Sequence, residues 1–198
     1  PEIEMPGHSS AALAAYPEYL CPNADSTNRE YGNSGVFCAG NDGTFTFLED
    51  VLDEVIGLFP SDYVHIGGDE VPKRFWKACP ECQARIRRER LNDEEELQSW
   101  FVRRMEQYLV SRGKKLIGWD EILQGGLAPE ATVMSWRGMK GGLEAARQNH
   151  DVVMTPEGSC YLNLYQGDPE LEPVAWGGFL PLNKVYAFDP VPEELTPG

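Results

Sequence analysis

The sequence predicts an α/β fold in which parallel strands are buried under helices. Segments with strand-like and helix-like periodicity alternate along the 198 residues. The strands are strongly apolar, which is typical of parallel strands covered on both faces. With 41% hydrophobic and 25% charged residues, the composition is that of a globular protein, and one domain is the default for this length.

The N-terminal part of the chain begins this alternation. EIEMPGH at 2–8 is expected to be a short strand that ends at Pro6 and Gly7, and the Ala-rich stretch 9–20 has the Ser start of a helix. In 44–59, apolar residues recur at spacings of three and four behind a Thr cap, which predicts an amphipathic helix. These apolar residues are Phe47, Leu48, Val51, Leu52, Val55 and Phe59.

The rest of the chain continues the same pattern. Further strands are expected at 63–66, 114–121, 131–138 and 151–158. Helices are expected at 97–113, closed by Gly113, and at 141–149. The first of these helices has an apolar face formed by Leu97, Phe101, Met105, Tyr108 and Leu109. Only a short Gly-rich connection precedes the strand at 131–138, so it has room for at most a small helix.

Two architectures fit this order of elements, an open doubly wound sheet and a (β/α) barrel. A complete eight-strand barrel typically needs about 250 residues, so this chain is too short to close one. It opens with PEIEMPGH rather than Met, and its Pro-rich end at 189–198 resembles a loop cut short. We therefore expect a segment of a longer protein, truncated at both ends.

The charge balance restricts the partners. The chain has 17 basic and 32 acidic residues, and a formal charge of -15 repels polyphosphates, so no nucleic-acid partner is expected. The basic run at 85–90 and the acidic run at 93–96 are interpreted as solvated helix faces. No apolar stretch approaches the roughly 20 residues of a transmembrane helix.

The cysteines leave two interpretations open. Cys21 and Cys38 bracket a polar loop, and they form either a bridge worth about 3 kcal/mol or two free thiols. Cys79 and Cys82 have the spacing of half a zinc site. Because no second CxxC or His pair follows at a suitable distance, we expect no structural zinc, and no other metal or cofactor.

The residues that finish the predicted strands are acidic and aromatic. The active site of a parallel α/β protein lies at the carboxyl ends of its strands. Carboxylates beside flat aromatic surfaces suit a sugar ring, because indoles stack on its apolar faces while acids bind its hydroxyls. The strand-end residues are His8, Asp69, Glu70, Trp119, Asp120, Glu121, Trp136, Arg137 and Tyr161.

Each of these residues also has a simpler interpretation. A single Trp at a strand end is more often part of the core, and Asp69 could cap a helix near Pro72. His65 is expected to be a buried histidine, satisfied by hydrogen bonds, that supports the site. Trp76 and Trp100 lie on helices and are assigned to packing.

Five motifs in this order resemble the β-N-acetylhexosaminidases of glycoside hydrolase family 20. They are PEIEMPGH, HIGGDE, GWDE, VMSWRG and YLNLYQG, and the resemblance runs from residue 1 to about residue 190. It implies a (β/α)8 TIM-barrel fold, of which 1–198 would be a partial barrel covering about strands 3 to 7. It also implies a retaining exo-hydrolase that releases terminal N-acetylglucosamine or N-acetylgalactosamine. Because such glycans are mostly met outside the cytoplasm, the full-length protein is expected to be periplasmic, extracellular or lysosomal.

The family resemblance assigns the two adjacent acids different roles. Members of this family depart from the usual two-carboxylate scheme, because the 2-acetamido group of the substrate makes the nucleophilic attack. Glu70 would be the general acid and then the base, while Asp69 would orient the acetamido group and stabilise the oxazolinium charge. An ionised Asp69 would also disfavour ionisation of Glu70. The glycines before the pair would end the strand and let both acids reach the pocket.

The other assignments follow the motifs residue by residue. Trp119 and Trp136 match the indoles around the acetamido methyl and the sugar, and Tyr161 the hydroxyl that binds the acetamido oxygen. His8 matches the histidine of the third-strand motif. Two positions depart from the family pattern: Glu4 replaces the usual Asp, and Asn163 stands where many members have an Asp that contacts a sugar hydroxyl.

Two other functions remain possible from the residues. One is a non-catalytic carbohydrate-binding module, and the other is a metal-dependent barrel hydrolase that uses His8, His65, Asp69 and Glu70. An arginine from the first barrel strand and a Trp and a Glu from the last have no counterpart in this segment. The isolated chain is therefore expected to be weakly active or inactive.

Overall fold

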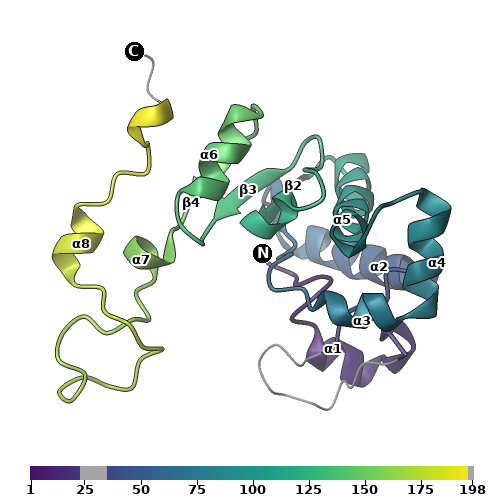
Figure 1. The fold of residues 1–198 in the computed structure, drawn as a ribbon, viewed down its shortest axis with the longest axis horizontal. Helices are drawn as coiled ribbons and strands as arrows, with labels where there is room; N and C mark the ends of the chain where they lie inside the picture. The colour runs from purple at the N-terminus through teal and green to yellow at the C-terminus, as the bar shows by residue number, and fades with distance from the viewer. Residues whose placement is uncertain (23–34, 196–198) are drawn as a thin grey trace. The chain divides into compact units, whose positions relative to one another are not determined.

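The computed structural model describes residues 1–22 and 35–195 and divides the chain into two compact units, residues 1–132 and 133–198 (Figure 1). The first unit contains two parallel strands, β1 (Tyr63–His65) and β2 (Lys115–Trp119), in the register Val64 to Leu116. The expected N-terminal strand is an extended segment, in which Glu2 forms a parallel bridge with His65. Because these segments run in the same direction, their carboxyl ends meet at one edge.

Helices follow each of these extended segments. They are α1 (Ser10–Ala15), the 3-10 helix η1 (Pro17–Tyr19), α2 (Asp42–Leu58), α3 (Lys73–Ala78), α4 (Pro80–Glu89), α5 (Glu94–Ser111) and the 3-10 helix η2 (Asp120–Leu123). The helix expected at 9–20 is interrupted after α1, because Pro17 has no backbone N–H to continue it. The short η2 occupies the connection that the sequence left for at most a small helix.

The N-cap of α2 lies three residues before the expected one. Asn41 is the N-cap, and its side chain accepts a hydrogen bond from Gly43 N at 2.9 Å. Thr44, the expected cap, is buried inside the first turn. Helix α2 buries Phe45, whose ring centroid lies 4.9 Å from that of Phe101 on α5. The apolar periodicity predicted the helix correctly, but Phe59, assigned to its apolar face, is exposed.

Helix α5 closely follows the prediction. Asp93 caps it by accepting hydrogen bonds from Glu95 N and Glu96 N, and Gly113 closes it with a φ of 71°. The residues of its buried face are Leu97, Phe101, Met105 and Leu109, whereas Tyr108 is only partly buried.

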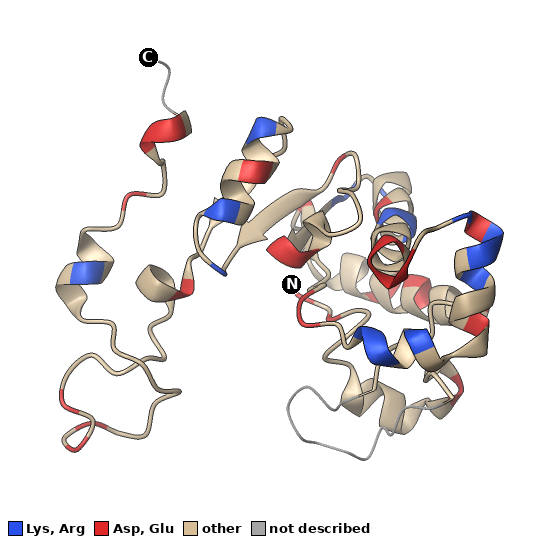
Figure 2. Ribbon diagram, viewed as in Figure 1, with Lys and Arg blue, Asp and Glu red and all other residues tan. Residues whose placement is uncertain are grey.

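The interpretation of the basic run as a wholly solvated face was wrong for Arg85. Figure 2 shows basic residues along α3 and α4, yet Arg85 on α4 is only 4% exposed. Its guanidinium bonds to Asp42 at the start of α2 and lies 4.6 Å from the ring centroid of Trp100. This ion pair links α4 to α2, because an unpaired charge on the buried Arg85 would be costly, although Asp42 itself is exposed.

The second unit repeats the pattern of strand, helix and strand. Strand β3 (Thr132–Ser135), which starts at the last residue of the first unit, pairs in parallel with β4 (Val152–Met154). Helix α6 (Lys140–Arg147) connects them, and Gly142 N in its first turn donates to Ser135 Oγ at 2.9 Å. Three short helices follow: α7 (Glu157–Cys160), α8 (Leu182–Tyr186) and the 3-10 helix η3 (Glu193–Leu195).

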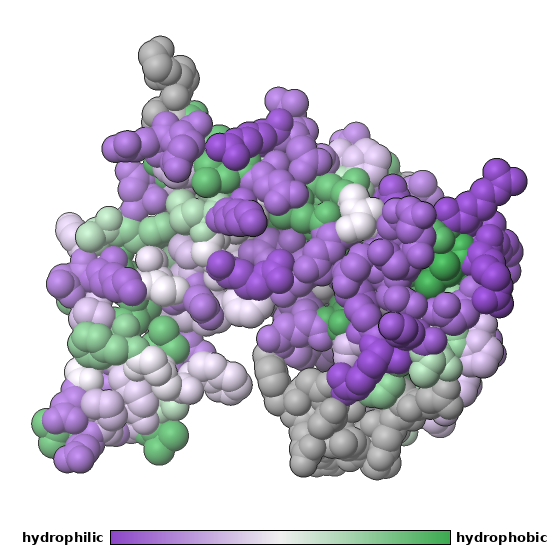
Figure 3. Space-filling model, in the orientation of Figure 1, coloured by the Kyte–Doolittle hydropathy of each residue, from purple (hydrophilic) through white to green (hydrophobic). Residues whose placement is uncertain are grey.

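In Figure 3 hydrophilic residues cover most of the visible face over α3 and α4. Among the residues that the structure describes, no helix is long and apolar enough to cross a membrane.

Candidate active site

A tight turn after β1 carries the adjacent acids. The strand ends at His65, and Gly67 and Gly68 then take left-handed φ values of 71° and 92°. A Cβ atom on Gly67 would lie 1.8 Å from Glu4 Oε2, so no larger residue fits there without displacing Glu4. Glu70 is also left-handed, with a φ of 49°, which costs a non-glycine residue about 1–3 kcal/mol. The expectation that the strand ends at the glycines is confirmed.

Both acids converge on His8. Its Nε2 atom lies 3.2 Å from Asp69 Oδ2 and 3.2 Å from Glu70 Oε2. His8 follows the extended N-terminal segment, which runs beside β1, and its own φ is 50°. Two strained backbone positions in two neighbouring segments therefore place a carboxylate pair around one imidazole.

His8 is positively charged at neutral pH. The hydrogen bond to Asp69 raises its pKa to about 9, against the opposing effect of partial burial. This imidazolium therefore contributes a positive charge beside the two carboxyl groups. Asp69 and Glu70 are therefore not an isolated pair of acids, because this cation lies beside both.

Glu4 is a further acidic side chain that interacts with Asp69 and His8. Burial first, and then the charge of Asp69, raise its pKa to about 8, so that Glu4 is mostly protonated at neutral pH. Its Oε2 atom is buried without a hydrogen-bond partner among the residues that the structure describes. Glu4 therefore supports the turn at Gly67 as an uncharged group.

His65 is buried, as expected, but only one of its nitrogens has a hydrogen bond. Gly67 N donates to His65 Nδ1 at 3.0 Å, so that the proton of a neutral ring is on Nε2. Burial lowers the pKa of His65, which keeps the imidazole neutral. Nε2 is buried without a partner among the described residues, so the expected satisfaction by hydrogen bonds is incomplete. The contact of His65 with the turn supports the site at Gly67.

Trp119 lies at the same edge. It ends β2, and its backbone N donates to Gly67 O at 2.9 Å, which joins it to the turn that carries the acids. Its Nε1 donates to Glu2 Oε1 at 2.8 Å. Its ring meets that of His65 edge to face at 4.8 Å. The orientation of this indole is therefore set on two sides.

In the second unit, Trp136 and Tyr161 are neighbours. Trp136 follows β3 directly and Tyr161 ends α7, and their rings stack with centroids 6.3 Å apart. Glu157 N donates to Trp136 O at 2.8 Å, which links α7 to the end of β3. Asn163 is exposed and lines a hollow that also includes Trp176. The structure thus brings together two of the three candidates in this unit.

Sequence reasoning missed two residues that position the site. Glu2 holds the indole of Trp119, and the side chain of Gln98, fully buried on α5, donates to Gly68 O at 2.6 Å. Lys73 Nζ donates to Oε1 of the same Gln98 amide. The sequence held one signal for Gln98: it is a polar residue next to Leu97, on the side of the predicted helix that is expected to be buried.

The structure brings together only some of the residues that a metal-dependent hydrolase would use. Among the described residues, ligand atoms of His8, Asp69 and Glu70 lie within 4.8 Å of one another, and His65 does not belong to this group. The raised pKa of His8 opposes metal binding, because a metal ligand must lose that proton.

Comparison with known proteins identifies the family. Residues 1–197 match the family described as glycosyl hydrolase family 20, catalytic domain. A β-hexosaminidase of Porphyromonas gingivalis is 59% identical over 98% of this chain, and one of Vibrio furnissii is 40% identical over 98%. The chain spans only 26% and 32% of the length of these two relatives.

Solved structures agree with this match. An exo-β-N-acetylglucosaminidase from Vibrio harveyi, determined in complex with N-acetylglucosamine, superimposes with a TM-score of 0.86 and 36% identity, over 99% of this chain and 31% of that one. A β-N-acetylhexosaminidase from Bacteroides fragilis gives 0.75 and 38%, over 85% and 34%. The parallel strand pairs fit the TIM-barrel type of this family. With the match running from residue 1 to residue 197, the chain belongs to glycosyl hydrolase family 20.

Proposed function

We propose that this chain is part of the catalytic domain of a retaining exo-β-N-acetylhexosaminidase. The observation that carries the proposal is the convergence of Asp69 and Glu70 on His8 at the carboxyl end of β1. Relatives that bear the name β-hexosaminidase cover almost all of the chain. The substrate class is an oligosaccharide or glycoconjugate with a terminal N-acetylglucosamine or N-acetylgalactosamine.

In the first step, Glu70 donates its proton to the glycosidic oxygen while the bond from that oxygen to C1 breaks. The carbonyl oxygen of the substrate's acetamido group forms the new bond to C1, which gives a cyclic oxazolinium ion. Asp69 accepts a hydrogen bond from the acetamido N–H and stabilises the positive charge. Its buried Oδ1, which has no hydrogen-bond partner among the described residues, is an acceptor suited to that N–H.

In the second step, the Glu70 carboxylate takes a proton from water while the water oxygen attacks C1. The bond from C1 to the acetamido oxygen breaks, which opens the oxazolinium ring and restores the acetamido group. Two inversions at C1 return the original anomeric configuration. His8, charged and 3.2 Å from both acids, holds them in place through both steps.

The aromatic residues are proposed to bind the sugar. Trp119 presents an indole fixed by Glu2 and His65, which suits an apolar sugar face. We assign Trp136 to the acetamido pocket, Tyr161 to a hydrogen bond with the acetamido oxygen, and Asn163 to a sugar hydroxyl. The amide of Asn163 forms a weaker bond there than a carboxylate would.

We also propose that the chain supplies about strands 3 to 7 of a larger barrel. The chain spans only 26% of the length of the Porphyromonas gingivalis relative, which supports this proposal. Large apolar side chains that are exposed in the second unit also support it. They are Leu171, Val174, Trp176 and Tyr186, with exposed fractions of 84%, 97%, 73% and 90%. Further barrel segments would cover such a surface. From the substrate class, we further propose that the full-length protein acts in the periplasm, a lysosome or the extracellular space.

The test is hydrolysis of chromogenic sugars by the full-length protein. The nitrophenyl β-glycoside of N-acetylglucosamine should be cleaved, whereas the matching glucoside should not, because it has no amide to form the oxazolinium ion. Glu70→Gln should lower kcat by roughly 10²- to 10⁴-fold, the usual contribution of a general acid. Binding of the sugar without hydrolysis by the wild-type protein would identify a carbohydrate-binding module instead. Equal cleavage of both glycosides would exclude substrate assistance.

A further inference from the structure

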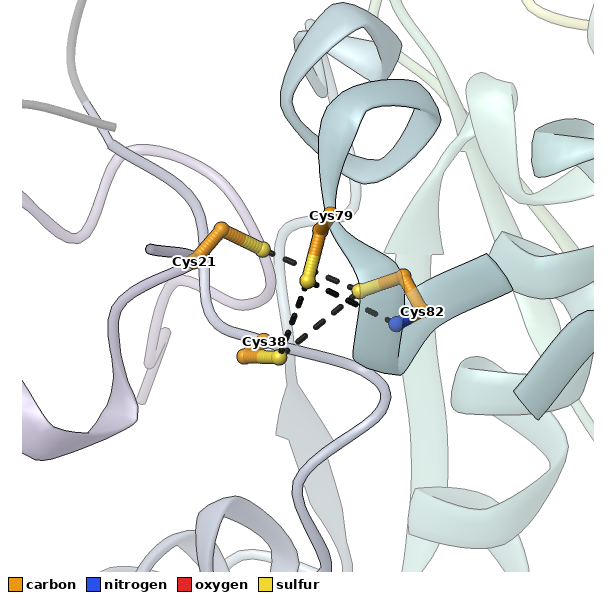
Figure 4. Close-up of side chains that lie close together, drawn as sticks. All are labelled: Cys21, Cys38, Cys79 and Cys82. Carbon is orange, nitrogen blue, oxygen red and sulfur yellow. Dashed lines mark hydrogen bonds between the residues drawn. The ribbon is translucent and has the colours of Figure 1, made fainter. Parts of the chain in front are cut away.

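Four cysteine side chains from separate parts of the first unit meet at one point. The Sγ atoms of Cys21, Cys38, Cys79 and Cys82 all lie within 4.8 Å of one another, and all four residues are buried (Figure 4). None of them takes part in the proposed sugar chemistry. The cluster is therefore a second feature of the unit, and it needs its own explanation.

Three of the six sulfur–sulfur distances within the cluster match those in a tetrahedron of metal ligands. Cys38 Sγ lies 3.7 Å from both Cys79 Sγ and Cys82 Sγ, and Cys82 Sγ lies 3.7 Å from Cys21 Sγ. Four sulfurs bound to zinc at about 2.3 Å have edges of about 3.8 Å. A disulfide joins each sulfur to a single partner at about 2.05 Å. Here two of the sulfurs each have two neighbours at the same distance, which favours a shared ion over two bridges.

The backbone around the cluster is arranged as in a metal-binding turn. Cys79 is the N-cap of α4, and Cys82 N donates to Cys79 Sγ at 3.5 Å. Such an N–H bond, together with the positive end of the ten-residue helix, stabilises thiolates. The Cys38 thiol also donates to Glu81 Oε2 at 3.6 Å. A bound cation would replace this proton and offset the repulsion between the resulting thiolate and the carboxylate.

The other two ligands come from an antiparallel contact. Leu20 and Phe37 form an antiparallel bridge, and Cys38 N donates to Tyr19 O at 2.8 Å. Cys21 directly follows Leu20 and Cys38 directly follows Phe37, so the two cysteines lie on the same side of this contact. Gly40 allows this segment to reach α4, because a Cβ there would lie 2.2 Å from the backbone of Glu81. The sequence gives no close pair for CPEC, and only the fold brings these two cysteines beside it.

We propose that Cys21, Cys38, Cys79 and Cys82 bind a single zinc ion in a closed structural site. Four sulfur ligands in a tetrahedron are typical of zinc, and a closed set leaves no position for catalysis. The ion would join the segment that follows His8 and α1 to the α3–α4 turn that follows Asp69 and Glu70. It would thereby hold together the two parts of the chain that carry the acid pair and its cation.

The test is metal analysis of the full-length protein, purified without chelator and without added metal. We expect one zinc ion per chain by elemental mass spectrometry, and four thiols that react with a thiol reagent only when that zinc is released. Cys82→Ser should lose the bound zinc, since removal of a direct ligand exceeds the roughly 10- to 100-fold loss of affinity seen for changes around ligands. Cys160→Ser is the matched control, because this cysteine is free and outside the cluster, and it should retain full zinc.

Two measurements on the wild-type protein do not depend on how the variants fold. A strong chelator should lower its Tm, and added zinc should restore it. The proposal would be overturned by an intact mass that shows disulfides among these four cysteines, by iron in place of zinc, or by four reactive thiols with no bound metal. None of these readouts depends on hydrolysis, so the zinc site and the proposed function can fail separately.

Discussion

At the scale of single residues, the site depends on backbone conformations that few side chains tolerate. His8 and Glu70 both have left-handed φ values near 50°, and Gly67 and Gly68 precede the acids with larger positive values. Left-handed backbone costs an ordinary residue about 1–2 kcal/mol. The two glycines remove this cost where they stand, and contacts with His8 offset it at Glu70.

Gly67→Ala should destabilise the protein more than Gly113→Ala. Both glycines have a φ of 71°, but a Cβ at Gly67 meets Glu4 Oε2 at 1.8 Å, whereas at Gly113 nothing lies within 4 Å. The control should therefore lose only the strain of about 1–2 kcal/mol. Chemical denaturation of both variants measures the difference in the free energy of unfolding. Equal losses would show that Glu4 moves aside at no cost.

Asp69→Asn should lower the pKa of His8 from about 9 towards its ordinary value of 6.5. The hydrogen bond to Asp69 is the largest cause of the raised pKa, and an amide cannot provide the charge that stabilises an imidazolium. NMR titration of the His8 ring protons measures the change. In Asp62→Asn, which alters an exposed carboxylate just before β1, the His8 pKa should stay near 9. An unchanged His8 pKa in Asp69→Asn would contradict the contact.

At the scale of elements, helix ends are set by caps that periodicity alone does not identify. Asn41 rather than Thr44, three residues further on, caps α2, because the Asn41 side chain accepts a hydrogen bond from Gly43 N. Asp93 starts α5 and Cys79 starts α4, each by accepting a backbone N–H with its side chain.

Asp93→Ala should lower the free energy of unfolding by about 1 kcal/mol, because two N–H groups at the start of α5 lose their acceptor. Asp93→Asn keeps an acceptor oxygen and should lose much less. Urea denaturation with an unchanged m-value measures both. A similar loss in the two variants would mean that the charge of Asp93, not its hydrogen bonds, supports α5.

At the scale of the whole molecule, the stability contributed by Glu4 and His8 should fall as the pH rises from about 5 to 9. The pKa of Glu4 is raised from 4.5 to about 8, so the folded state binds more protons than the unfolded state between these values. The pKa of His8 is raised from 6.5 to about 9, so its stabilisation is complete below 6.5 and is lost as the pH passes 9. For both groups, the free energy of unfolding therefore decreases as the pH rises.

Thermal unfolding across this pH range measures the trend, at high salt to screen the net charge of -15. The double variant Glu4→Gln, His8→Gln should flatten the curve, since neither glutamine titrates. A slope that is unchanged in this variant would assign the pH dependence to other groups.

The sequence by itself determined the alternation of elements, the acid pair after β1 and, through its motifs, the family. Local physics is sufficient for these features: apolar periodicity defines a helix such as α5, and glycines followed by Asp69 and Glu70 define the turn. Tertiary structure decided which distant residues meet. His8 lies between the acids, Arg85 is buried against Asp42, and Cys21 and Cys38 join Cys79 and Cys82. Those contacts depend on the packing of segments far apart in the chain, and the spacing of residues along a sequence carries no record of that packing.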